Sequence, residues 1–161
     1  MVDLQSKIRL ILSSRIDELN GRRITHKEAE KLKKTFSKLI PNWFINILFD
    51  FPLIGCDFEL SEDLDISELG VGMQWMSAAD TIWESTEAYP GIAAVLVGYL
   101  PVGMCTYGSG DPYFLNTKDI ALPLVRIPHT ALDKNGKLIE EDIELVCSNL
   151  SNFFEIVEIE Q

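Results

Sequence analysis

Histidine and cysteine, the residues most used for metal binding and nucleophilic catalysis, are scarce in this chain. Its 161 residues include only two histidines, His26 and His129, and three cysteines. The histidines lie far apart in sequence, and neither has a cysteine or acid beside it at ligand spacing, so we expect no metal and no cofactor. A Cys/His nucleophilic pair stays open, although no local pattern supports one.

Disulfides and membrane segments are also missing. Cys56, Cys105 and Cys147 are odd in number and stand singly among apolar neighbours, so we expect buried free thiols. The longest apolar stretch, residues 91–102, contains two glycines and a proline and falls short of the roughly 20 residues that span a bilayer. The first residues lack the basic cluster and apolar block of a signal peptide. We therefore expect a cytoplasmic protein with no membrane partner.

Positive charge is in short supply. Fourteen basic residues face 25 acidic ones, giving a net charge of -11. Residues 1–50 carry a net +4 and residues 51–161 a net -15. So acidic a chain repels phosphates, which argues against a nucleic-acid partner. It can attract a basic protein, while solubility alone is the alternative explanation of the charge.

The first third of the chain has helical periodicity. Apolar residues from Leu4 to Leu19 recur at helical spacing up to a stop at residues 20–21. Thr25 and Glu28 form a capping-box pattern before a second apolar stripe that runs to Ile40. Lysines 31, 33, 34 and 38 suit the C-terminal end of that helix, with a nucleic-acid patch as the less favoured reading. A short helix follows Pro41.

From residue 53 the pattern favours strands. Ile54, Cys56, Phe58 and Leu60 alternate with polar residues or glycine, and residues 73–76, 92–97, 102–107, 113–115 and 122–127 are further expected strands. Ser77 predicts a helix start between the expected strands at residues 73–76 and 92–97. The tail is either a strand over residues 143–147 and a helix capped by Ser148, which we prefer, or one helix over residues 140–157. The order predicts an α+β fold with N-terminal helices, then a small, mostly antiparallel sheet with flanking helices.

Glycine-rich, acidic and tryptophan-containing segments are the candidate sites of this chain. Residues 108–112, Gly-Ser-Gly-Asp-Pro, contain no lysine and precede a strand, so a hairpin turn is favoured over a phosphate loop. The acidic stretches at residues 62–68 and 140–144 could supply an acid–base pair, but such dense carboxylates favour a solvated, partner-facing surface. The first stretch lacks the glycine and final glutamate of an EF-hand. Trp43, Trp75 and Trp83 are expected in the core, with an interface anchor as the alternative.

The ordered set of motifs in the second half resembles the SUKH superfamily, the Smi/Knr-type proteins. The segments are Tyr-Leu-Pro-Val-Gly at residues 99–103, Gly-Ser-Gly-Asp-Pro-Tyr-Phe-Leu at 108–115, and the stretches 123–129 and 145–154. The likeness spans about residues 25–157 of one domain over residues 1–161, with residues 1–24 as an additional N-terminal helix. Asp50-Phe51-Pro52 stands where the family often has an Asn-Gly-Gly-like turn, and residues 61–72 match no family segment.

The resemblance implies a binding protein and not an enzyme. Bacterial SUKH proteins are commonly immunity proteins that neutralise a toxin, often a nuclease or deaminase. The expectation is occlusion of the active site of a basic cognate toxin by an acidic face. The acids expected to make contact are Glu62, Asp63, Asp65 and Glu68, followed by Glu140, Glu141 and Asp142. A regulatory interaction module without a toxin is the alternative function, and an enzyme is the third hypothesis. The oligomeric state and the toxin's identity do not follow from the sequence.

Overall fold

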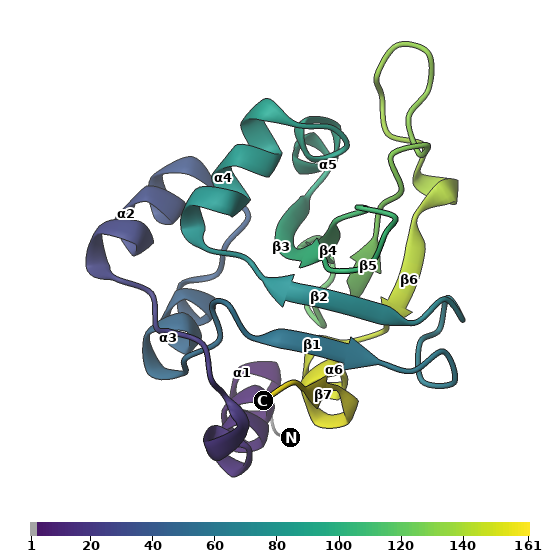
Figure 1. The fold of residues 1–161 in the computed structure, drawn as a ribbon. Helices are drawn as coiled ribbons and strands as arrows, with labels where there is room; N and C mark the ends of the chain where they lie inside the picture. The colour runs from purple at the N-terminus through teal and green to yellow at the C-terminus, as the bar shows by residue number, and fades with distance from the viewer. Residues whose placement is uncertain (1–2) are drawn as a thin grey trace.

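A curled antiparallel sheet of seven strands forms the centre of the structure, a computed structural model that describes residues 3–161 (Figure 1). The strand order is β6-β5-β4-β3-β2-β1-β7, and every neighbouring pair is antiparallel. The α+β class with an antiparallel sheet is thus confirmed. The strands are β1 (Asp57–Leu60), β2 (Val71–Trp75), β3 (Tyr99–Cys105), β4 (Tyr113–Asn116), β5 (Leu124–Arg126), β6 (Glu144–Cys147) and β7 (Glu158–Ile159).

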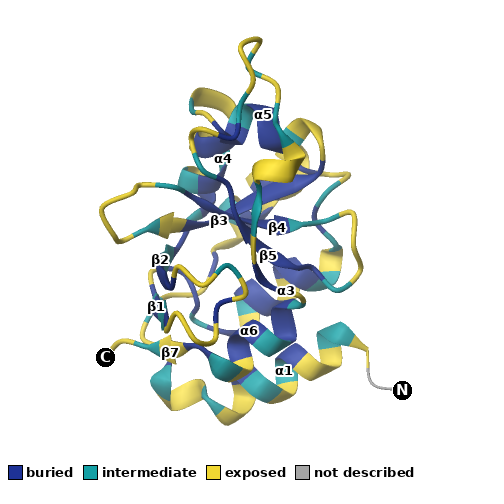
Figure 2. Cartoon of the chain, turned by 90° about the vertical axis from the view of Figure 1, so that its right-hand side faces the viewer, coloured by how far each residue is buried: buried dark blue, intermediate teal, exposed yellow. Residues whose placement is uncertain are grey.

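Helices cover the sheet unevenly. In the described chain they are α1 (Leu4–Ser14), α2 (His26–Thr35), α3 (Asn42–Asp50), α4 (Ala78–Glu87), α5 (Gly91–Leu96) and α6 (Leu150–Ile156), with 3-10 turns η1 (Ile16–Glu18) and η2 (Glu140–Asp142). Helices α1, α3 and α6 gather below the sheet, and their inner faces are buried (Figure 2). Helix α5 lies against the opposite face of β3 to β5 over a smaller apolar cluster that includes Ala94, Tyr99 and Phe114.

Aromatic side chains join the C-terminal helix to the sheet. Phe154 of α6 lies 5.6 Å from Trp75 of β2 between ring centroids, and Phe153 lies 5.8 Å from Phe58 of β1. All four rings are almost completely buried. Because large aromatic rings bury the most apolar area per residue, this cluster fixes α6 against the first two strands.

Helix starts agree with the local sequence signals. The Thr25 hydroxyl accepts a hydrogen bond from the Glu28 amide, and the Glu28 carboxylate accepts one from the Thr25 amide, which confirms the capping box of α2. Ser77 likewise caps α4 by accepting from the Asp80 amide. Pro41 directly precedes α3, as expected.

One expected strand is wrong. Residues 92–97 lie in and just after α5, a six-residue helix, instead of a strand. A short, continuous apolar run does not distinguish a buried strand from a buried helix. Here Ala93 and Ala94 pack into the protein, and their small size lets the helix approach the sheet closely.

Smaller differences concern element ends and tryptophans. Helix α1 ends at Ser14, α2 ends at Thr35, and α6 is capped by Asn149 in place of Ser148. The tail adopts the strand-then-helix arrangement.

Trp75 is in the core and Trp43 is partly buried, but Trp83 is 58% exposed on α4, so its expected burial is wrong. Met1 and Val2, which the expected N-terminal helical segment includes, lie outside the described residues.

The curl of the sheet brings the β1–β2 connection onto β6. We name residues 61–70 the acidic loop. Its Ile66 amide donates a hydrogen bond of 3.0 Å to the Val146 carbonyl of β6, the strand at the far end of the sheet. The loop and β6 therefore lie side by side, on the right in Figure 1.

Candidate protein-binding surface

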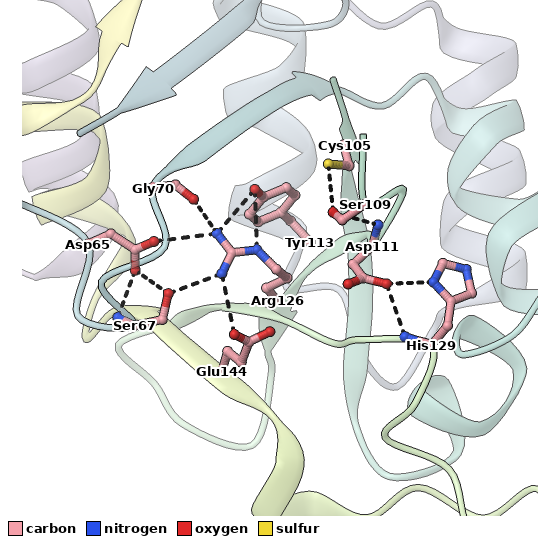
Figure 3. A network of polar contacts seen from close by, with 10 residues as sticks. All are labelled: Asp65, Ser67, Gly70, Cys105, Ser109, Asp111, Tyr113, Arg126, His129 and Glu144. Carbon is pink, nitrogen blue, oxygen red and sulfur yellow. Dashed lines mark hydrogen bonds and ion pairs between the residues drawn. The ribbon is translucent and has the colours of Figure 1, made fainter. Parts of the chain in front are cut away.

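Asp65 is a buried residue that stabilises the acidic loop from its inner side. Its carboxylate accepts hydrogen bonds from the Ser67 amide at 2.8 Å and the Ser67 hydroxyl at 2.7 Å, an arrangement that closes a tight turn. Its other oxygen lies 3.4 Å from a guanidinium nitrogen of Arg126 (Figure 3). Asp65 is only 3% exposed, so it is not available for direct contact with a partner, unlike the expectation from sequence.

Arg126, on β5, is the buried cation that organises this region. Its guanidinium donates to the Tyr113 hydroxyl, the Ser67 hydroxyl and the Gly70 carbonyl, and it lies 3.7 Å from the Glu144 carboxylate. Burial opposes its charge, but the bonds to Tyr113 and the charges of Asp65 and Glu144 outweigh burial and raise the pKa of Arg126. The guanidinium therefore stays charged and links the loop to three strands.

Glu144 is the second carboxylate beside this cation. Burial raises the pKa of Glu144, and the nearby charges of Asp111 and Asp65 raise it further, while Arg126 lowers it. Two carboxylates thus share one guanidinium, and a third, Asp111, lies close enough to interact. The local charge is therefore negative even within the polar network.

Asp65 and Ser67 turn towards Arg126, whereas most of the other side chains of the acidic loop are exposed. Glu62, Asp63 and Glu68 are exposed, as the sequence led us to expect for contact residues. Leu64 and Ile66 lie between these acids and Leu69 directly follows Glu68; the three are 51%, 54% and 57% exposed. The loop therefore presents apolar side chains interleaved with carboxylates, a composition typical of protein-binding surfaces.

The second set of acids leads into β6. Glu140, Glu141 and Asp142 form η2 and are all exposed. Glu140 makes an ion pair of 2.8 Å with Lys118, which is itself about half exposed. Because η2 directly precedes β6 and the acidic loop is bonded to β6, both sets of acids lie along the same edge of the sheet.

A cavity of about 250 Å³ lies beside the loop. The β3–β4 hairpin forms one wall, and the tip of this hairpin is fixed by Asp111, whose carboxylate lies 2.6 Å from the ring Nδ1 of His129 and accepts from the His129 amide (Figure 3). The hairpin turn expected at residues 108–112 is confirmed. The residues lining the cavity are Leu69, Gly70, Cys105, Tyr107, Ser109, Asp111, Tyr113, Arg126 and Glu144.

The polar groups around the cavity are engaged with one another. The Cys105 thiol contacts the Tyr107 carbonyl and the Ser109 hydroxyl, whereas His129 contacts Asp111. The Cys/His pair that the sequence left open is therefore not formed by Cys105 and His129. All three cysteines are free thiols and Cys56 and Cys147 are buried, as expected, but Cys105 is only partly buried, so its expected burial is wrong. Over residues 3–161, no cluster of three or more His, Cys, Asp or Glu side chains could hold a metal ion.

Neither a protein-family model nor a curated protein matches this chain. Within the described residues, no helix has the length and apolar character needed to cross a membrane.

Sequence reasoning missed two components of this surface. Arg126 and Tyr113 fall within expected strands, and no local pattern distinguishes a buried arginine in a short strand from its neighbours. Leu64, Ile66 and Leu69 lie inside an acidic stretch whose charge dominates its interpretation. Their apolar character was a usable signal, since a purely solvating loop does not need three large apolar residues among its acids.

Proposed function

We propose that this chain is a SUKH-type immunity protein, which binds a basic bacterial toxin in the cytoplasm and blocks its active site. The observation that supports this best is the acidic loop, whose exposed carboxylates and apolar side chains are held on a fixed backbone by the buried Asp65–Arg126 pair. The sequence resemblance supplies the class of partner. Toxins that act on nucleic acids need basic surfaces to hold phosphate, and such a surface complements this one.

Occlusion needs no catalytic group on the inhibitor. Opposite charges on the two surfaces speed their encounter, and burial of apolar side chains slows dissociation. The acids proposed for contact are Glu62, Asp63 and Glu68 of the loop, followed by Glu140, Glu141 and Asp142 of η2. Asp65 supports them from beneath. The protein would act without a metal or cofactor.

A regulatory interaction module is the second candidate, and the same surface would serve it. The two functions differ in the partner. Co-expression with the product of the open reading frame directly upstream of this gene separates them, because an immunity protein rescues growth and co-purifies with its toxin. If the upstream product is harmless and does not bind, the immunity function fails and the regulatory one is favoured.

The electrostatic part is tested by reversing three loop charges, Glu62→Lys, Asp63→Lys and Glu68→Lys. We expect association with the upstream toxin to slow by about tenfold at low salt, with a smaller effect at high salt where charges are screened. Stopped-flow or surface plasmon resonance at two salt concentrations measures this.

A matched control keeps the same change in net charge. Asp17→Lys, Glu30→Lys and Glu87→Lys reverse three other exposed acids that have no ion-pair partner in the described structure. We expect a weaker effect from this control. An equal effect would show that only net charge matters and that the loop is not the contact.

A further inference from the structure

Three large apolar side chains of the acidic loop are more exposed than packing requires. Leu64, Ile66 and Leu69 each leave more than half of their surface in solvent, although they lie within six residues of one another. Burying such side chains in the core is favourable, because it removes apolar surface from water. Their joint exposure on one short loop therefore calls for a functional explanation.

The loop backbone is already ordered. The Leu64 and Asp65 amides donate to the Ser61 carbonyl, the Glu68 amide donates to the Asp65 carbonyl, and the Ile66 amide donates to Val146. The Ser67 amide is bonded to the buried Asp65 carboxylate. Binding a partner would therefore cost little backbone conformational entropy. More of the free energy of the apolar contacts would then contribute to affinity.

We infer that Leu64, Ile66 and Leu69 form the apolar centre of the acidic interface, and that they insert into an apolar depression with a basic rim on the partner protein. This inference rests on the proposed binding function and adds the shape and chemistry of the partner's surface. Interfaces derive most of their affinity from a few apolar anchors surrounded by polar contacts. Here Glu62, Asp63 and Glu68 are exposed neighbours of the anchors along the loop and would face the basic rim.

The opposite end of the molecule offers a less suitable site for such a partner. A groove lined by Phe36, Leu39 and Leu96 lies between α2 and α5, and Lys38 stands on its wall. Lys33 and Lys34 lie in the last turn of α2. These lysines would repel a basic protein, so charge complementarity favours the acidic loop over this groove.

The test replaces the anchors with a small polar residue, as Leu64→Ser, Ile66→Ser and Leu69→Ser in one protein. The control is Leu10→Ser, Leu96→Ser and Ile120→Ser, three apolar residues that are 68%, 82% and 94% exposed outside the loop. Thermal unfolding and circular dichroism confirm that both variants fold. With the upstream toxin, we expect the loop variant to dissociate about tenfold faster or more, with association little changed, and the control to stay within about twofold of wild type. Equal effects of the two variants would overturn the inference.

A second arm does not depend on the toxin. The probes are a synthetic amphipathic helix of leucine and lysine and a peptide of equal charge in which serine replaces leucine. We expect the first peptide to shift the backbone amide resonances of residues 61–70, the serine peptide to shift them far less, and the loop variant to lose the effect. Equal binding of both peptides, or shifts confined to η2 or to the α2–α5 groove, would contradict an apolar centre. If the toxin fails to bind wild type while the leucine peptide still marks the loop, the immunity function fails and the docking surface stands.

Discussion

Asp65 and Arg126 show how single buried charges can position an exposed surface. Their side chains are nearly inaccessible to water, at 0% and 5% exposed, so neither touches a partner directly. Yet the contacts of Arg126 reach Ser67 and Gly70 of the loop, Tyr113 of β4 and Glu144 of β6. The orientation of the apolar anchors therefore depends on an ion pair below them.

Breaking this pair should destabilise the fold. Asp65→Ala leaves Glu144, at 3.7 Å, as the remaining ion-pair partner of the buried Arg126 and removes the acceptor for Ser67, so we expect a loss of about 3 kcal/mol in the free energy of unfolding. Urea denaturation measures this. The control is Asp63→Ala two residues earlier, an exposed acid whose removal should change stability by no more than about 0.5 kcal/mol. Equal midpoints for the two variants would show that the buried pair contributes nothing net.

At the scale of elements, helix starts depend on short-range contacts. Helix α2 begins at a capping box in which Glu28 also pairs with Arg22 at 2.8 Å. The hydrogen bonds from Arg22, together with those from Thr25, lower the pKa of Glu28 from its ordinary 4.5 to about 2. Since the folded pKa lies below the unfolded one, the charged form contributes stability above pH 4.5, and this contribution is lost as the pH falls towards 2.

Glu28→Gln should therefore lower stability at neutral pH and not in strong acid. Glutamine keeps the capping hydrogen bond but not the charge, and the half-exposed Arg22 limits the loss to about 0.5 kcal/mol. The difference from wild type should narrow below pH 4.5 and close near pH 2, as followed by urea midpoints across pH. Glu30→Gln removes an exposed carboxylate of the same helix that has no ion-pair partner among the described residues, and it should show no such trend. A gap that stays constant with pH would contradict the role of the charge.

The type of one element does not follow from local signals, although the starts of two helices do. The helices over residues 26–35 and 78–87 follow caps whose donor and acceptor lie three residues apart, so sequence alone revealed their starts. The run over residues 91–97 had no such signal. Its helical state is decided by the fit of Ala93 and Ala94 beneath their neighbours, a property of the packed molecule.

At the scale of the whole molecule, one apolar cluster connects both ends of the sheet. Cys56, just before β1, and Cys147, at the end of β6, are both almost completely buried members of this cluster. Burial raises the pKa of the Cys147 thiol to about 11 and also raises that of Cys56. Neither thiolate is accessible to a reagent unless the cluster opens.

Thiol labelling should therefore report global unfolding. In native protein at pH 8, we expect Cys105 to react with a disulfide reagent quickly, because it borders the cavity beside the loop. Cys56 and Cys147 should react slowly and at a common rate set by cooperative opening. Cys105→Ala removes the fast phase and isolates the slow one. Clearly different rates for Cys56 and Cys147 would show that the two ends of the sheet open separately.

Features that depend on neighbours along the chain follow from the amino-acid sequence alone. These include the capped helix starts, the alternating strand through Phe58 and Leu60, the hairpin turn at residues 108–112, and the division between a basic N-terminal third and an acidic remainder. Each follows from contacts within a few residues or from composition, so no knowledge of the fold was needed.

Which acids face solvent depends on contacts between distant parts of the chain. Asp65 sits among exposed acids in sequence, yet it is buried because Arg126, 61 residues away, comes to it when the sheet curls. The same curl leaves Leu64, Ile66 and Leu69 outside while their neighbour turns inward. Ion pairs and burial depend on distances in space. For residues separated by several strands, the distance along the chain does not determine the distance in space.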